Sequence, residues 1–265
     1  MAKKTKKEEV KVEEEATTSS ASISGISPTA RDFISPRVCI GFHSHGSVHP
    51  RFTFALARAC AYEGNKIAGV IPVIGPLLED CRNNIVSTFL DQFPEVDYLL
   101  MVDADIEFPS DAVGKSLFMM RYFGQDTLYG NYALGDGRNS IFTKTPDCGL
   151  FRMVPVEGDQ TYLGIAGGGT GWLLMTRELL EKMRAKYPKP FVWFGRDIVT
   201  DDKGELTALG EDLTFGKRAG ECGAKQMGTS QIALLHYKER AIIPKAMVDL
   251  VGQQYPGAEF MEPKG

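Results

Sequence analysis

Two carboxylates stand one residue apart directly after an apolar run. The run Tyr98–Val102 leads into Asp103 and Asp105, and Pro109 follows shortly after. An apolar run bounded by acids and a proline is typical of a buried strand in a parallel sheet, and ligands collect where such strands end. Alternation along extended backbone puts both side chains on one face. Oxygen ligands of this kind suit Mg²⁺ or Mn²⁺, so the pair predicts a site for a hard cation.

The same two residues also have a purely local interpretation. Aspartate is frequent in turns after strands because its side chain hydrogen-bonds to the nearby backbone. A calcium loop of the EF-hand type is not expected, because its sixth position requires glycine and Phe108 stands there.

A glycine-rich segment, Gly167–Gly171, follows much later in the chain. Consecutive glycines let backbone approach a ligand closely, so Gly168 and Gly169 are predicted to line a binding site. The alternative is a flexible turn before a strand. The segment is neither a Walker A loop, since no Lys-Ser/Thr follows it, nor a dinucleotide fingerprint, which belongs after the first strand of a βαβ unit.

Two further polar features lie near the end of the chain. Glu211 and Asp212 open an expected helix, where acids are either functional or simply favourable at a helix N-terminus. His236 ends an apolar run and is either a structural residue or a metal ligand, since imidazole accompanies carboxylates in Mn²⁺-type sites.

The first half of the chain alternates apolar runs with amphipathic segments. Three strand–helix pairs in succession predict a mostly parallel α/β sheet of the nucleotide-binding type. The expected strands are Arg37–Phe42, Lys66–Val73 and Asp97–Val102, and the expected helices are Arg51–Glu63, Leu77–Gln92 and Pro109–Phe123.

The second half is less regular. Short β segments separated by polar turns are expected at Thr127–Leu134, Ser140–Thr143, Gly149–Val156, Leu173–Met175 and Ser230–Leu235. Helices are expected at Arg177–Lys186 and Glu211–Gly220, with a long loop at Pro188–Leu209 between them. Long irregular loops beside sites often act as lids, so this loop is predicted to become ordered when a ligand binds.

Composition places the chain among globular proteins. With 265 residues and 43% hydrophobic content it can form one large domain. The net charge of −4 gives no overall basic footprint for nucleic acid. Five scattered cysteines without a Cys-x-x-Cys pair indicate a reducing, cytoplasmic setting. No apolar run approaches the length of a membrane span, and no secretory signal is recognised. Residues 1–30 are predicted to be a disordered charged tail before a single domain at 31–265.

The order of these motifs resembles that of the GT-A glycosyltransferases, in particular the family 2-like enzymes of bacteria and phages. The resemblance extends from about Arg37 to Tyr237. It implies an α/β, Rossmann-like, mostly parallel sheet with an acceptor-side region of β segments and loops. It also implies transfer of a sugar from a nucleotide-sugar, with UDP as the usual nucleotide, through Mn²⁺ or Mg²⁺.

The resemblance assigns roles to individual residues. Asp105 would bind the metal directly, Asp103 would contact the ribose or the hydrated metal, and His236 would be a late-strand metal ligand. Asp212 would be the general base of an inverting enzyme, and Glu211 would orient the acceptor or exchange roles with it.

Nucleotide contacts are expected at the ends of the first strands. His43 and Ser44 follow strand one, and Arg82 and Asn83 lie in the second helix, where arginine could complement diphosphate charge. The alternatives are a plain loop and a surface arginine. Three histidines form a further metal alternative, although their spacing matches no common zinc pattern: His43, His45 and His49.

Trp172 is expected to be a platform for the sugar or acceptor, and its alternative is burial in the core. Trp193 is a second acceptor-side candidate.

Other classes of protein share parts of this pattern. A haloacid-dehalogenase phosphatase carries its Asp-x-Asp after the first strand, whereas two strand–helix units precede Asp103 here. A nucleotidyltransferase usually has a glycine-rich basic loop after strand one, which Phe42–Gly46 does not resemble. An inactive nucleotide-sugar-binding module remains an alternative. The acceptor is open: a glycan, or a hydroxymethylated base of phage DNA, in which case the host cytoplasm is the setting.

Overall fold

The protein is described by a computed structural model that covers residues 37–134, 137–144, 151–156, 158–187, 189–190, 192–200, 204–237 and 241–242. The predicted tail at residues 1–30 lies outside these residues. Within the described residues, no helix is long and apolar enough to cross a bilayer.

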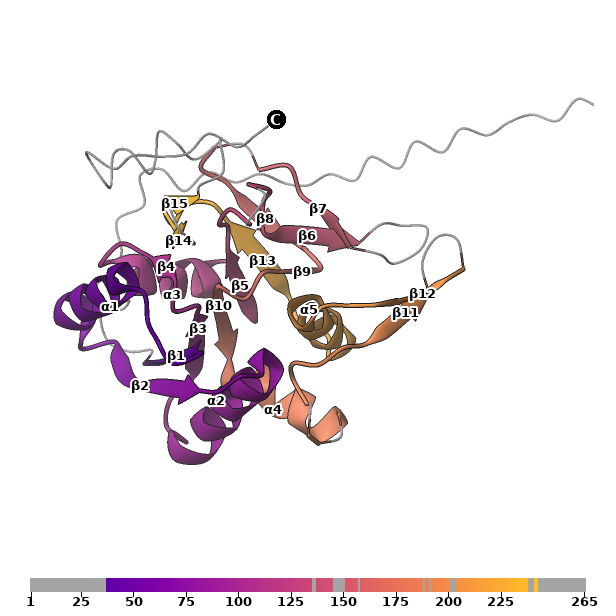
Figure 1. Cartoon of the computed structure of the whole chain (residues 1–265), viewed down its shortest axis with the longest axis horizontal. Coiled ribbons are helices and arrows are strands. Elements are labelled where there is room, and N and C mark those ends of the chain that lie inside the picture. The colour runs from indigo at the N-terminus through magenta and orange to yellow at the C-terminus, as the bar shows by residue number, and fades with distance from the viewer. Residues whose placement is uncertain are drawn as a thin grey trace, which may run out of the picture.

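A seven-stranded sheet forms the centre of the fold (Figure 1), in the order β2-β1-β3-β10-β5-β13-β8. These strands are β1 Val38–Ser44, β2 Ile67–Ile74, β3 Tyr98–Val102, β5 Thr127–Gly130, β8 Thr161–Leu163, β10 Trp172–Thr176 and β13 Gln226–Thr229. Only β10 and β8 run against the other five. The predicted α/β class with a mostly parallel sheet is therefore confirmed.

In the described part of the chain, five helices cover the two faces of this sheet (Figure 1): α1 Pro50–Glu63, α2 Leu78–Gln92, α3 Ala112–Tyr122, α4 Arg177–Lys186 and α5 Glu211–Glu221. Residues of α1 and α3 share one apolar core with Leu100 and Trp172 of the sheet. Residues of α2, α4 and α5 share the other with Leu99 and Leu173. Alternate residues of β3 and β10 thus feed opposite cores, which is why both strands are apolar throughout.

Smaller sheets extend this body. One is formed by β4 Ile106–Glu107, β14 Leu235–Tyr237 and β15 Ala241–Ile242, and another by β6 Ile141–Lys144, β7 Phe151–Met153 and β9 Gly167–Gly168. A two-stranded hairpin of β11 Ile198–Thr200 and β12 Leu206–Ala208 projects from the body beside α5 (Figure 1).

The first three strand–helix pairs are confirmed to within a few residues. Two predictions for the second half are wrong. The segment Pro188–Leu209 is not a plain loop, because it contains the β11–β12 hairpin. The strand expected at Ser230–Leu235 is not formed, since β13 ends at Thr229 and pairing resumes only at Leu235 in a different sheet. An apolar run that packs as a buried loop gives the same signal as a buried strand.

Candidate active site

Asp103 and Asp105 follow β3 at the carboxyl edge of the sheet, where a site was expected. Their backbone is fixed by segments distant in sequence. The N–H of Asp103 donates to the carbonyl of Gly171 over 3.1 Å, and the carbonyl of Asp105 accepts from the N–H of Tyr237 over 2.8 Å. The glycine-rich segment therefore positions the backbone of Asp103, and β14 positions that of Asp105.

A buried arginine connects the first of these acids to helix α5. The guanidinium of Arg82 donates to Asp103 Oδ1 over 2.9 Å and to Glu211 Oε1 over 2.6 Å, and only 5% of its side chain is exposed. Burial by itself would lower the pKa of Arg82, but the two carboxylates outweigh it and raise the pKa. Arg82 is therefore a fixed cation that holds the start of α5 beside the end of β3.

Asp212 lies next to this bridge in the first turn of α5. Burial raises its pKa to about 6, and the neighbouring Glu211 carboxylate adds to the shift. The backbone N–H of Leu213 donates to Asp212 Oδ1 over 2.7 Å, and this hydrogen bond lowers the pKa of Asp212 in part. A carboxylate that takes up a proton near pH 6 is suited to general-base chemistry at neutral pH.

Asp105 and His236 come together because β14 pairs with β4, which follows the acids directly. His236 Nδ1 lies 2.8 Å from the carbonyl of Ala133. A carbonyl only accepts, so Nδ1 carries the hydrogen, and in neutral histidine Nε2 then holds a lone pair. Nε2 faces Asp105 Oδ2 at 3.3 Å, a separation at which two acceptors need a proton or a cation between them.

These residues fit a divalent cation as a pair of ligands rather than as a complete cage. A carboxylate and an imidazole fixed by a backbone carbonyl are a usual donor set for Mn²⁺. No group of three or more His, Cys, Asp or Glu side chains converges on one point within the described part of the chain. The Asp103 carboxylate, which was predicted as a third ligand, is engaged by Arg82.

His43 and Ser44 lie at the end of β1, next to the acids. His43 Nδ1 is 3.9 Å from Asp103 Oδ1, and burial lowers the pKa of His43. Ser44 is almost fully buried, and its hydroxyl accepts from the N–H of Gly46. Their predicted contact with a nucleotide stays a prediction.

Asn83 was predicted to bind the nucleotide, but in the structure its side-chain amide is hydrogen-bonded to backbone groups. Its Nδ2 donates to the carbonyls of Glu79 and Phe194, and its Oδ1 accepts from the N–H groups of Trp193 and Phe194. With these bonds formed, Asn83 holds the segment before the hairpin against α2. The nucleotide-binding prediction for Asn83 is therefore wrong.

Gly168 and Gly169 are glycines because tyrosines pack on them. A Cβ at Gly168 would lie 2.7 Å from the Tyr129 ring, and one at Gly169 would lie 2.2 Å from the Tyr132 hydroxyl. All of Gly167–Gly171 is buried. Glycine is needed at these two positions because the rings of Tyr129 and Tyr132 occupy the space that a side chain would fill. The prediction that Gly168 and Gly169 approach a ligand is therefore corrected: they approach aromatic rings of the core.

Trp172 is fully buried, which contradicts its predicted role as a sugar platform. Its ring packs against Phe108 with centroids 4.9 Å apart, and its indole N–H donates to Ser116 Oγ over 3.1 Å. Trp193 is also buried, with its indole N–H donating to the carbonyl of Leu180. The core alternative holds for Trp172, and Trp193, which was predicted only as an acceptor-side candidate, is also a core residue.

Tyr132 is the residue of this region that the sequence analysis did not identify. Its hydroxyl accepts from the N–H of Gly171 over 3.0 Å, and its ring meets His236 edge-on with centroids 5.4 Å apart. Burial, followed by the negative charge of Asp103, raises its pKa, so the phenol stays neutral. Tyr132 could have been identified from its position, because it follows β5 at the same edge of the sheet as Asp103.

No protein-family model matches the chain, and no curated protein matches it. Among solved structures, A197 from STIV is similar with a TM-score of 0.54 and 20% sequence identity, over 86% of this chain and 98% of that chain. At this identity the likeness shows a shared fold alone.

Solved glycosyltransferases are also among the structures that the chain resembles. One is a glycosyltransferase involved in the glycosylation of the major capsid of PBCV-1, with a TM-score of 0.34 and 13% identity over 55% of this chain and 62% of that chain. Another is GalNAc-T7 with UDP, GalNAc and Mn²⁺, with a TM-score of 0.47 and 10% identity over 79% of this chain and 44% of that chain. Both likenesses are too distant to carry this chain's activity.

Proposed function

We propose that this protein is a metal-dependent glycosyltransferase that moves a sugar from a nucleoside-diphosphate sugar, with UDP favoured, to an acceptor hydroxyl. The observation that carries the proposal is the Arg82 bridge. It joins Asp103, at the end of β3, to Glu211, and thereby brings Asp212 to the same edge of the sheet. A donor-side acid and a candidate base beside it are what a transfer between two bound substrates needs.

The proposed reaction inverts the configuration of the sugar. The acceptor oxygen forms a bond to the anomeric carbon while the bond from that carbon to the diphosphate breaks, and the diphosphate leaves with the electron pair. The acceptor proton passes to the Asp212 carboxylate, whose raised pKa suits the task. Glu211, which Arg82 holds in place, orients the acceptor or exchanges roles with Asp212.

Asp105 and His236 are the residues that would hold the divalent cation, with Mn²⁺ or Mg²⁺ as candidates. When bound there, the cation would supply positive charge to the leaving diphosphate. Two protein ligands would be sufficient for such a site, because phosphate oxygens and water would supply the remaining ligands.

The donor site can be tested by thermal unfolding with nucleoside diphosphates and nucleotide-sugars, each with and without Mn²⁺. A ligand at 100 times its dissociation constant stabilises the native state by about 2.7 kcal/mol. We expect a shift that needs both nucleotide and metal, that is lost in Asp105→Asn and that persists in Asp212→Asn. Asp91→Asn, which alters an exposed carboxylate paired with Arg184, is the matched control.

Turnover is the second measurement, with release of nucleoside diphosphate from a nucleotide-sugar as the readout. Asp212→Asn is expected to bind donor but not to transfer. Donor binding without turnover in the wild-type chain would favour the inactive binding module instead. The absence of a thermal shift with every nucleotide and metal pair would overturn the proposal.

The acceptor is proposed only by class, as a glycan hydroxyl or a hydroxymethylated DNA base. Retention on DNA that weakens steeply with salt would support the second, and no retention at low salt would leave the glycan.

A further inference from the structure

Tyr132 places a hydroxyl group beside the acids of the candidate active site. It follows β5 and is 5% exposed. Its hydroxyl accepts from the N–H of Gly171, and the carbonyl of that same glycine accepts from the N–H of Asp103. Its ring meets His236, whose Nε2 faces Asp105. Tyr132 therefore contacts a neighbour of each of the two acids.

The backbone around Tyr132 fixes the position of this hydroxyl. The N–H of Tyr132 donates to Ser140 Oγ over 3.0 Å. A side chain on Gly169 or on Gly171 would collide with the phenol, so the ring fills space that both glycines leave open. The hydroxyl is therefore held at one place before any ligand binds, as preorganised recognition requires.

The hydrogen of the Tyr132 hydroxyl has no acceptor among the residues that the structure describes. A phenol can donate one hydrogen bond as well as accept, and the contact with Gly171 uses only its oxygen as an acceptor. A buried donor that stays unpaired is unfavourable, and native structures contain few of them. The hydroxyl can therefore donate one further hydrogen bond to a ligand.

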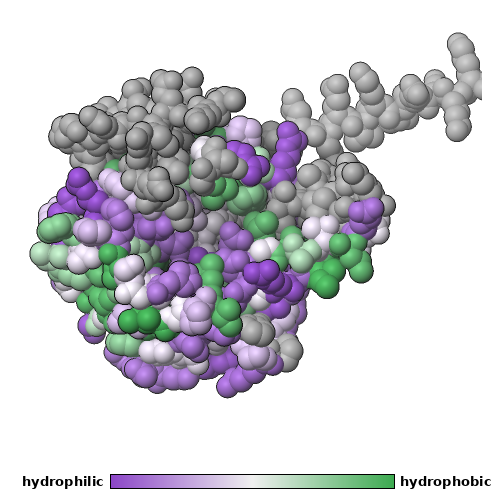
Figure 2. Space-filling view, viewed as in Figure 1, coloured by the Kyte–Doolittle hydropathy of each residue, from purple (hydrophilic) through white to green (hydrophobic). Residues whose placement is uncertain are grey.

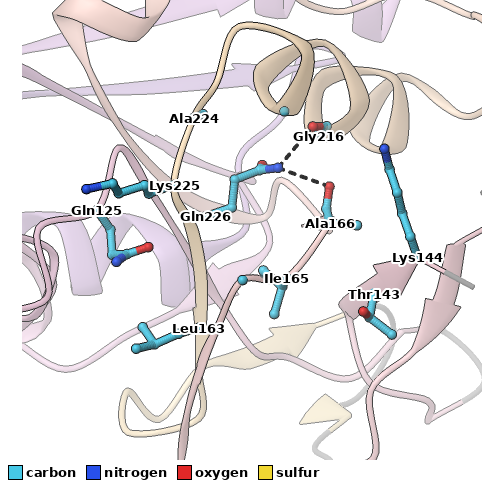
Figure 3. A pocket seen from close by; sticks show the side chains of 12 residues that line it. Gln125, Thr143, Lys144, Leu163, Ile165, Ala166, Gly216, Ala224, Lys225 and Gln226 are labelled. Carbon is cyan, nitrogen blue, oxygen red and sulfur yellow. Dashed lines mark hydrogen bonds between the residues drawn. The ribbon is translucent and has the colours of Figure 1, made fainter. Parts of the chain in front are cut away.

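Other tyrosines of the described chain do not share this feature. An exposed phenol is served by water, as for Tyr62 of α1, the helix at the left of the molecule in Figure 2. The buried phenols of Tyr129 and Tyr162 donate to side-chain amides. The amide that Tyr129 reaches, that of Gln226, is bonded in turn to two backbone carbonyls (Figure 3). Tyr129 thus belongs to a complete structural network, whereas Tyr132 does not.

The charge around the Tyr132 hydroxyl indicates which kind of ligand group it would meet. Burial is the largest cause of the raised pKa of Tyr132, and the negative charges of Asp103 and Asp212 add to it. The positive charge of Arg82 acts in the opposite direction and less strongly. A negative potential disfavours a phosphate at the phenol and favours a neutral acceptor such as a sugar hydroxyl.

We propose that the Tyr132 hydroxyl donates a hydrogen bond to a hydroxyl of the transferred sugar and thereby contributes to the choice of donor sugar. This inference rests on the proposed glycosyltransferase function. In that reaction the sugar stands between the diphosphate, near Asp105 and His236, and the candidate base Asp212. A site that hydrogen-bonds a substrate hydroxyl discriminates strongly against an analogue that lacks it, because the buried donor is then left unpaired.

The test is a calorimetric titration of the full chain, with Mn²⁺ present, using UDP, UDP-glucose, UDP-galactose and UDP-N-acetylglucosamine. Tyr132→Phe should bind the nucleotide-sugar that the wild type prefers about tenfold more weakly, as expected for loss of one hydrogen bond. Its affinity for UDP should be unchanged. Equal weakening of UDP would indicate an effect on the nucleotide or through Asp103, and unchanged binding of the nucleotide-sugar would show no contact. Either result overturns the inference.

Tyr129→Phe is the matched control, because it removes a buried phenol of β5 whose hydrogen is already accepted by Gln226. Its affinities for UDP and for the nucleotide-sugar should both equal those of the wild type. If both tyrosine variants weaken nucleotide-sugar binding to the same extent, the loss is a general effect of altering the core, and the assignment to Tyr132 is wrong.

A measurement on the wild-type chain does not depend on how well Tyr132→Phe folds. With ¹³C at tyrosine Cζ, the NMR resonance of Tyr132 should move when the preferred nucleotide-sugar binds and should move much less with UDP. Equal shifts would overturn this inference alone and leave the proposed function standing. Failure of the wild type to bind any of the four ligands with Mn²⁺ would overturn the proposed function, and this inference with it.

Discussion

The protonation state of Asp212 that favours folding differs from the one that the proposed reaction needs, because a general base must be ionised. Its pKa of about 6 in the folded chain lies above the ordinary carboxyl value of 3.8, so the native state favours the protonated form. The resulting stabilisation is complete below about pH 4 and is lost as the pH rises through 6. At neutral pH the buried negative charge therefore destabilises the fold.

We expect Asp212→Asn to stabilise the protein at pH 7 by about 1 kcal/mol, because the neutral amide avoids the charge. The measurement is urea unfolding at pH 7 and at pH 4, and the gain should disappear at the lower pH. An equal gain at both pH values would show that charge is not its origin.

The Arg82 bridge has a different energetic character, because breaking it leaves carboxylates without their cation. Arg82→Met is expected to destabilise the fold by about 3 kcal/mol, as for other buried ion pairs that lose one partner. Glu211→Gln in the same chain should recover part of the loss. Arg184→Met, which breaks the exposed pair with Asp91, is the control and should change the free energy of unfolding by less than about 1 kcal/mol. Similar losses in both single variants would contradict a special role for the bridge.

The elements show which parts of the fold could be predicted from the sequence. The first three strand–helix pairs carry local signals, namely apolar runs followed by amphipathic helices, and these were predicted correctly. The position of β10 between β3 and β5 depends on pairing between segments distant in sequence, and no local pattern specifies it. The same limit applies to β14, whose pairing with β4 brings His236 to Asp105.

The candidate site also contains features that the sequence could predict and features that it could not. The resemblance to GT-A glycosyltransferases implied that Asp103 and Glu211 belong to one site, and in the structure Arg82 joins them. The roles of Gly169 and Trp172 could not be predicted, because glycine beside a ligand and glycine beneath an aromatic ring look alike in sequence. Burial, which distinguishes a platform from a core tryptophan, is a property of the folded chain.

The glycine assignment leads to a direct comparison of two alanine substitutions. Gly169→Ala should destabilise the fold by about 2 kcal/mol, because the new methyl group would meet the buried Tyr132 hydroxyl at 2.2 Å. Gly220→Ala lies within α5 without a close contact and should stabilise by about 0.5 kcal/mol through higher helix propensity. Thermal or urea unfolding measures both. A neutral Gly169→Ala would return that glycine to the list of candidate ligand contacts.

At the scale of the whole described structure, the β11–β12 hairpin projects from the body formed by the sheet and helices. Ile198 and Leu206 of the β11–β12 hairpin are 66% and 76% exposed, so the hairpin buries little apolar surface. Its base is nevertheless fixed to α5. The N–H of Asp197 donates to Thr214 Oγ1, and its carboxylate pairs with Lys217 and Arg218. A displacement of α5, whose first turn carries Glu211 and Asp212, would therefore also move the base of the hairpin.

The sequence predicted that the segment containing this hairpin becomes ordered when a ligand binds, and hydrogen exchange of the hairpin amides can test that prediction. Without ligand, the amides of β11 and β12 should exchange with solvent much faster than those of β3 or β10, because exposed two-stranded pairs open readily. With UDP and Mn²⁺, the hairpin amides should become protected while those of β3 remain unchanged. Asp197→Asn should weaken the connection and reduce the added protection without abolishing donor binding. Donor binding that leaves the exchange of the hairpin unchanged would mean that residues 198–208 are a static appendage, and acceptor recognition would then be sought elsewhere on the carboxyl edge of the sheet.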